Sequence, residues 1–99
     1  MIMEDVKVPL LSKVDFNGES FAELTFREPD VGDMIMAEAE AAALGGGQQA
    51  TTAALLASMA GVSFAAFQRV KARDLKRILE ATKAYLGNAP EGGQASGAT

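Results

Sequence analysis

The stretch Leu24–Ile35, LTFREPDVGDMI, marks a point where a strand is expected to give way to a helix. Glu28 precedes Pro29, and a residue before proline is pushed out of the helical region of backbone space. Asp30 is a good N-cap, and Asp33 places a second carboxylate where the free amides and the dipole of a helix favour negative charge. The stretch therefore predicts a helix that begins at about residue 31.

A β-hairpin is expected before this point. Asn17-Gly18 is a strong signal for a two-residue hairpin turn, because both turn positions need a positive φ that Asn and Gly tolerate. The flanking apolar runs predict strands at about Val6–Phe16 and Glu19–Arg27. Pro9 has no amide hydrogen to donate, so it predicts a strand edge or a bulge. With this turn, the expected register pairs Phe16 with Glu19, Val14 with Phe21 and Leu11 with Leu24.

Three or four helices are expected after the hairpin. Val31, Met34, Ile35, Ala41 and Leu44 follow helical spacing up to the run Gly45–Gly47, which ends the first helix in a loop. A second helix is expected at about Gln49–Ala60, before Gly61. Ser63 is a plausible N-cap for a short third helix, and a fourth, at about Ala72–Leu86, has the cleanest apolar stripe in the chain.

These elements predict one α+β domain over residues 1–87, with the hairpin at about 6–27 and the helices at about 31–86. One hairpin is marginal alone, so the helices should cover one of its faces. The segment 88–99 is small, polar and glycine-rich, and disorder is expected there.

The composition bears on the class of function. The chain has no Cys and no His, so it lacks thiolate ligands, disulfides and an imidazole base, which disfavours catalysis. The first residues, MIMEDVKV, lack the basic start and the apolar run of a signal peptide, and no run is long enough to span a bilayer, so a cytoplasmic location is expected. Residues 1–50 hold ten acids and three bases, and residues 51–99 hold six bases and three acids. Halves of opposite charge suit head-to-tail self-association or a polar partner, although a packed domain can also neutralise itself.

No motif indicates a catalytic, cofactor or metal site. The acids of EPDVGD match no spacing of an oxygen-rich metal loop, which favours helix capping and surface charge. The run Gly45–Gly47 lacks the Lys-Ser/Thr of a phosphate loop and is expected to be a connector.

Two further groups of residues have alternative interpretations. The bases Arg69, Lys71, Arg73, Lys76, Arg77 and Lys83 would suit a helix-turn-helix that binds DNA, but the chain is acidic overall, and Glu80 can pair with Lys76 or Lys83 along a solvated helix face. Met34, Met36 and Met59 would suit an adaptable binding groove, although methionines also fill cores.

The order of these pieces resembles a known family. The pattern is carried by Leu24, Phe26, Arg27, Glu28, Pro29, Gly32 and Asp33, followed by the block Leu55–Val62, LLASMAGV, and two helices. Over about Val6–Leu86 the chain is similar to the small tail-assembly chaperones of Mu-like and related contractile-tailed bacteriophages. The alanine-rich helix after Asp33 and the long glycine loop depart from that pattern, which leaves the placement of the first two helices open.

This resemblance implies a non-enzymatic protein without cofactors. Such chaperones bind the tape-measure protein in the bacterial host cytoplasm, keep its hydrophobic helices soluble and are absent from the finished virion. The family often also makes a longer, frameshifted product, which would diverge after about Asn88.

On physical grounds, six residues are candidates for a partner-binding groove: Met34, Ile35, Leu55, Met59, Phe64 and Phe67. The strand edges of the hairpin are candidates for self-association. The rival functions are a minor structural tail component, such as a tube or connector subunit, and a small DNA-binding regulator.

Overall fold

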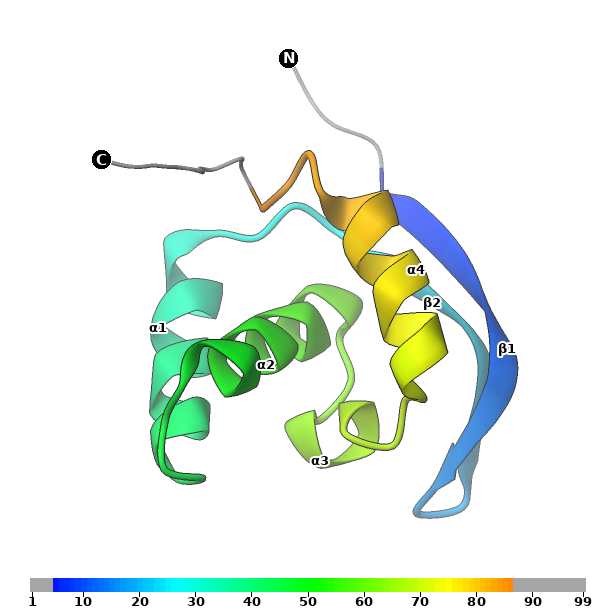
Figure 1. The fold of residues 1–99 in the computed structure, drawn as a ribbon, viewed down its shortest axis with the longest axis horizontal. Helices are drawn as coiled ribbons and strands as arrows, with labels where there is room; N and C mark the ends of the chain where they lie inside the picture. Colours follow the sequence, from blue (N-terminus) through cyan, green and yellow to red (C-terminus); the bar gives the residue numbers. More distant parts are fainter. Residues whose placement is uncertain (1–4, 87–99) are drawn as a thin grey trace.

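The computed structural model describes residues 5–86, in which a two-stranded antiparallel hairpin is followed by four helices (Figure 1). The elements are β1 (Val6–Phe16), β2 (Glu19–Phe26), α1 (Val31–Ala42), α2 (Gln48–Ala60), α3 (Phe64–Phe67) and α4 (Ala72–Thr82). The α+β class predicted from the sequence is confirmed. The predicted disordered segment 88–99 lies outside the described residues.

The hairpin turn forms where the sequence places it. Asn17 and Gly18 have φ values of 53° and 80°, so both adopt the positive φ that a two-residue turn requires. Phe16 pairs with Glu19 and Val14 pairs with Phe21, as predicted. β2 ends at Phe26, one residue before the predicted end.

Further from the turn, the predicted pairing of Leu11 with Leu24 is wrong, because Val8 is the partner of Leu24. The register shifts between Pro9 and Val14, where residues 10–13 of β1 span the same interval as Ala22 of β2. The extra residues form an irregular bulge, which agrees with the prediction for Pro9. The bulge reverses the face that Leu11 occupies, and the Leu11 side chain is 64% exposed.

The hairpin curves around one side of the helices, and the core lies between them (Figure 1). Phe26, Leu56 and Ile78, from β2, α2 and α4, are fully buried there. The rings of Phe26 and Phe67 meet edge to face, with centroids 6.5 Å apart. The core therefore ties the strands to helices that follow 30 to 50 residues later in the sequence.

The first helix lies on the outer side of α2 (Figure 1). It turns small side chains inward, since Asp33, Ala37 and Ala41 are its buried residues. After α1 the chain passes through Gly45–Gly47, all with positive φ. Thus the helix approaches α2 closely with its small side chains, and its large apolar residues are left on the other side.

The later helices follow the predictions with small changes. Ser63 caps α3 by accepting a hydrogen bond from the Ala66 amide, and Gly61 ends α2 in the left-handed conformation. α4 ends at Thr82 instead of Leu86, and a turn follows in which the Tyr85 and Leu86 amides donate to the Thr82 carbonyl. None of the helices within residues 5–86 is long and apolar enough to cross a membrane.

Candidate partner-binding surfaces

The LTFREPDVGDMI stretch forms a reciprocal cap at the start of α1. Asp30 accepts a 2.9 Å hydrogen bond from the Asp33 amide, and Asp33 accepts a 2.8 Å hydrogen bond from the Asp30 amide. Gly32 lies close to this cap, and a Cβ there would stand 3.2 Å from the Asp30 carboxylate. The acids mark a helix start, as predicted.

Asp33 also joins three elements. Its carboxylate accepts two hydrogen bonds from the Arg27 guanidinium, at 2.7 and 2.8 Å, and one from the Ser58 hydroxyl at 2.5 Å. The Arg27 hydrogen bonds, with those of Ser58 and the Asp30 amide, hold the pKa of Asp33 well below its ordinary value despite burial. Arg27 directly follows β2 and Ser58 lies on α2, so this carboxylate fixes the start of α1 to both.

The other family-motif residues have structural positions as well. Leu24 and Phe26 belong to the core, and Glu28 is exposed at the junction before Pro29. The motif therefore builds the corner from which α1 projects.

A second buried carboxylate was not among the residues singled out from the sequence. Asp74, in the first turn of α4, is fully buried and accepts hydrogen bonds from the amides of Leu11 and Ser12 at 2.9 and 3.0 Å. Burial raises the pKa of Asp74, but these two amides and Arg77 outweigh it, so the pKa lies below its ordinary value. Asp74 thus caps the bulge of β1, and no local sequence signal reveals a partner so distant.

The arginines of the basic run contact the hairpin. Arg77 donates to the Pro9 carbonyl at 2.5 Å, Arg73 donates to the Ser12 hydroxyl at 3.1 Å, and Arg69 lies over the Phe16 ring, 5.7 Å from its centroid. These contacts give all three arginines a role in holding β1 to the helices.

The lysines of the basic run point away from this contact. Lys71, Lys76 and Lys83 are exposed, and Lys83 forms a 3.4 Å ion pair with Glu80, one of the two pairings predicted for that glutamate. Across residues 5–86, no three Asp, Glu, His or Cys side chains converge to hold a metal ion.

The six candidate groove residues are divided between core and surface. Met59 and Phe67 are buried in the core, and Leu55 and Phe64 are half-buried. Met34 and Ile35 are 54% and 62% exposed on α1. The structure thus places only this last pair fully at the surface.

Met34 and Ile35 are two of four large apolar side chains that are exposed on α1, and we call this set the α1 face: Val31, Met34, Ile35 and Met36. Val31, Met34 and Ile35 lie on one side of the helix, and Met36 lies about 100° further round from Ile35. Val31 and Ile35 are one helical turn apart, so they stand next to each other. Val31 is 68% exposed and Met36 is 55% exposed. Met36 was one of the methionines that would suit an adaptable groove, whereas Val31 was not a candidate for binding.

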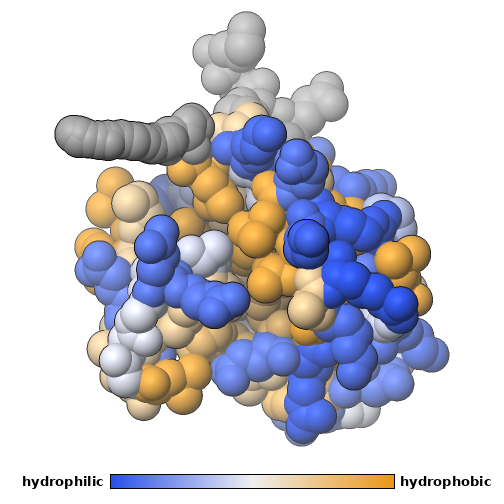
Figure 2. Space-filling view, in the orientation of Figure 1, coloured by the Kyte–Doolittle hydropathy of each residue, from blue (hydrophilic) through white to orange (hydrophobic). Residues whose placement is uncertain are grey.

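A second apolar surface lies between α2 and α4. This α2–α4 groove comprises two neighbouring hollows that share Leu79. The first lies between the helices and is lined by Gln48, Gln49, Thr52, Ala53, Leu75 and Leu79, and the second lies along α4 and the turn after it and is lined by Lys76, Leu79, Glu80, Lys83 and Leu86. Figure 2 shows apolar side chains gathered between the two helices, with hydrophilic residues of α4 beside them. Lys76 and Lys83 were considered only for DNA binding, and no α4 residue of the groove was a candidate for binding a protein partner.

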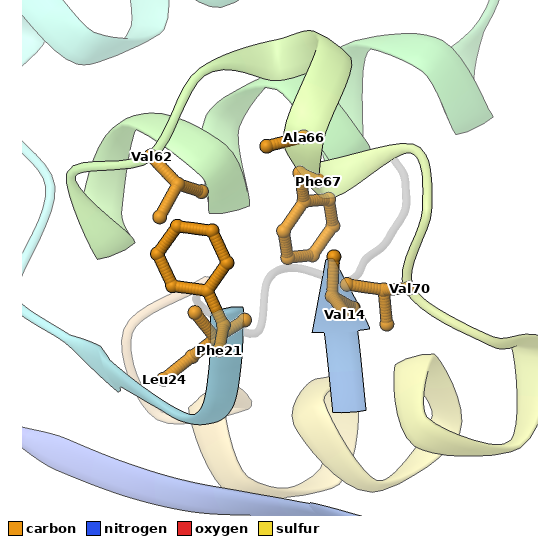
Figure 3. Close-up of a pocket in the computed structure, with 7 residues that line it drawn as sticks. All are labelled: Val14, Phe21, Leu24, Val62, Ala66, Phe67 and Val70. Carbon is orange, nitrogen blue, oxygen red and sulfur yellow. The ribbon is translucent and has the colours of Figure 1, made fainter. Parts of the chain in front are cut away.

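The hairpin and α3 also enclose an apolar cavity (Figure 3). Phe21 and Val14 project into it from the strands, and Val62, Phe67 and Val70 close the other side. The space among these side chains is too small for a ligand, so we interpret it as a packing gap in the core.

Comparison with known proteins agrees with these features. The family described as "Phage tail assembly chaperone proteins, E, or 41 or 14" matches residues 7–87, and the chain belongs to this family. The resemblance drawn from the motif is therefore confirmed, and the family supports a role as a chaperone of tail assembly. Searches of curated proteins and of solved structures gave no match.

Proposed function

We propose that this chain binds the tape-measure protein through the α1 face and keeps it soluble while the phage tail is assembled. Membership of the tail assembly chaperone family supports the general role. The observation that carries the proposal is the exposure of four large apolar side chains on one helix, each more than half exposed. In this proposal the protein is non-enzymatic, acts in the host cytoplasm and does not enter the finished virion.

The α1 face has the properties that a helical partner requires. Full burial of a Val, Ile or Met side chain contributes roughly 1.5–3 kcal/mol, so partial burial of four such side chains supports a stable contact. Two of the four are methionines, whose flexible side chains adapt to different apolar surfaces. An amphipathic helix laid against this face would shield its own apolar stripe from other chains.

The cap at Asp33 keeps this face in a fixed position. Because Arg27 and Ser58 hold the start of α1, the helix presents Val31 and Ile35 without having to fold on binding. A preformed surface binds with a smaller loss of conformational entropy than a disordered segment.

Co-expression with the tape-measure protein tests this proposal. The wild-type chain should keep the partner in the soluble fraction and co-purify with it, and Ile35→Asp should lose most of that effect. Leu11→Asp is the matched control, because Leu11 is as exposed as Ile35 but lies on the β1 bulge. Circular dichroism should show that both variants keep the wild-type fold.

Two results would count against the proposal. If Leu11→Asp lost the partner as completely as Ile35→Asp, the α1 face would not be the binding site. If the chain were found in purified virions at a fixed copy number, the role of a structural tail component would replace that of a chaperone.

A further inference from the structure

We propose that copies of this chain associate head to tail, with the α1 face of one copy seated in the α2–α4 groove of the next. The two surfaces are apolar, and both are exposed in a single chain. Both surfaces belong to the chain itself, so this association needs no other protein. It uses the same α1 face as the proposed function, so self-association and binding of the tape-measure protein compete for that face.

The charges beside the two surfaces are complementary. α1 contains Glu38 and Glu40 and no base, and Glu38 follows Met34 by one turn, at the end of the α1 face. Lys76 and Lys83 line the groove on the α4 side. A docked α1 helix can therefore bury Val31, Met34 and Ile35 against Leu75 and Leu79 while the Glu38 carboxylate faces a lysine.

The dimensions of the elements are also compatible. α1 has 12 residues, and the groove is built from helices of 13 and 11 residues. At 1.5 Å per residue these helices are about 17–20 Å long, so one can lie along the other two. An interface formed by a single short helix falls below the size of a typical stable complex, so we expect weak and reversible association.

The groove cannot be filled by α1 of the same chain. α2 lies between α1 and α4, and α1 packs on the opposite side of α2 (Figure 1). The contact joins two different surfaces, the α1 face of one copy and the α2–α4 groove of the next. It is therefore heterologous and can extend over several copies.

The end of the same chain is a poor occupant of the groove. The described chain stops at Leu86, which lines one end of the groove. Residues 87–99, GNAPEGGQASGAT, contain no apolar side chain larger than that of alanine or proline. They offer little to cover Leu75 and Leu79, whereas the α1 face offers two methionines, a valine and an isoleucine.

Complementation between two variants tests this geometry. Ile35→Asp blocks the α1 face, and the double variant Lys76→Glu/Lys83→Glu reverses the charge of the groove at two exposed positions, where folding is not at risk. Sedimentation equilibrium should give the wild type an average mass that rises above 10.3 kDa with concentration and continues past that of a dimer. Each variant alone should stay at the monomer mass.

The decisive sample is an equal mixture of the two variants. The intact α1 face of the Lys76→Glu/Lys83→Glu variant can bind the intact groove of the Ile35→Asp variant. The two surfaces left free in this pair are the altered ones, so the average mass of the mixture should stop at twice the monomer mass. Adding Glu38→Lys to the groove variant would place a lysine opposite glutamates when two such chains meet, and should restore self-association of that chain.

Three outcomes would overturn the proposal. They are a wild type that remains at 10.3 kDa at every concentration, a closed dimer that does not extend, and association that persists in either variant alone. In the last case the hairpin edges would be the remaining candidate. A monomeric wild type that still bound the tape-measure protein through Ile35 would leave the proposed function intact and refute only this inference.

Discussion

Asp74 accepts a 2.9 Å hydrogen bond from the amide of Leu11, which lies 63 residues earlier in the chain. The neighbouring amide of Ser12 donates to the other oxygen of the same carboxylate. The bulge in β1 directs these two amides away from β2, and α4 supplies the acceptor that β2 does not. One buried carboxylate thus completes the hydrogen bonding of the irregular part of the hairpin.

Replacement of Asp74 by alanine should lower the free energy of unfolding by about 2–4 kcal/mol. The change removes the acceptor for two amides and leaves Arg77 without its buried partner, and loss of a buried partner costs roughly 1–3 kcal/mol per group. Urea denaturation followed by circular dichroism measures the effect. Glu80→Ala on the exposed side of α4 is the control and should change stability by about 0.5 kcal/mol or less. Equal loss in both variants would show that Asp74 has no special role.

Stability should fall in acid because of Asp33 and Asp74. Both have a folded-state pKa below the ordinary value of about 3.9, so their contribution is present above that pH and is lost as the pH falls towards the folded-state values. The free energy of unfolding should therefore change little between about pH 7 and pH 5 and decrease below about pH 4.

Urea titrations at a series of pH values check this dependence. Asp33→Asn and Asp74→Asn should each be less stable than the wild type near neutral pH and should show a shallower decrease in acid. Unchanged slopes in the two variants would contradict the assignment.

The Ser58 hydroxyl should stabilise the fold through Asp33. Ser58→Ala removes one hydrogen bond to a charged acceptor, and we expect a loss of about 1–2 kcal/mol with the fold retained. The control Ser20→Ala removes a hydrogen bond to the Asp15 carboxylate that is exposed to solvent, and it should stay within about 0.5 kcal/mol of the wild type. A Ser58→Ala chain as stable as the Ser20→Ala chain would show that Arg27 alone holds Asp33.

Polar replacement on the α1 face should leave stability almost unchanged. Ile35→Ser removes an apolar side chain that is 62% exposed, so the free energy of unfolding should change by about 0.5 kcal/mol or less. Binding of a dye that reports exposed apolar surface should decrease at the same time. A large loss of stability would mean that Ile35 packs against the rest of the chain, which would remove it from the binding surface.

Local signals made most of the fold predictable. The Asn17-Gly18 turn, the Asp30 cap and the Gly61 stop each depend on the backbone conformation of a few adjacent residues, and each forms as predicted. Register near the turn follows from the turn itself. On the other side of the β1 bulge from the turn, the strand register depends on contacts with Asp74 and Arg77. These residues follow the bulge by more than sixty positions, so the pairing of Leu11 could not be predicted from local sequence.

The candidate site was predicted only in part, for a different physical reason. Periodicity identified the apolar stripe of α1 but not the direction in which it points. Of that stripe, Ala41 packs beside Ala37 on the α2 side of the helix, and Val31, Met34 and Ile35 face solvent. On α2 and α3 the large residues face inward, so Met59 and Phe67 became core. The six candidate residues therefore fall into exposed, half-buried and buried groups that the sequence pattern did not distinguish.

The Asp74 contact also has a consequence for the time at which the domain can mature on the ribosome. The hairpin is complete in sequence at Phe26, but its bulge has no acceptor until α4 has been translated. Thr82, the end of α4, follows Phe26 by 56 residues, so at about 5–20 residues per second this delay lasts about 3–11 seconds. During that interval the nascent hairpin has an open and irregular strand, and only the arrival of α4 closes it.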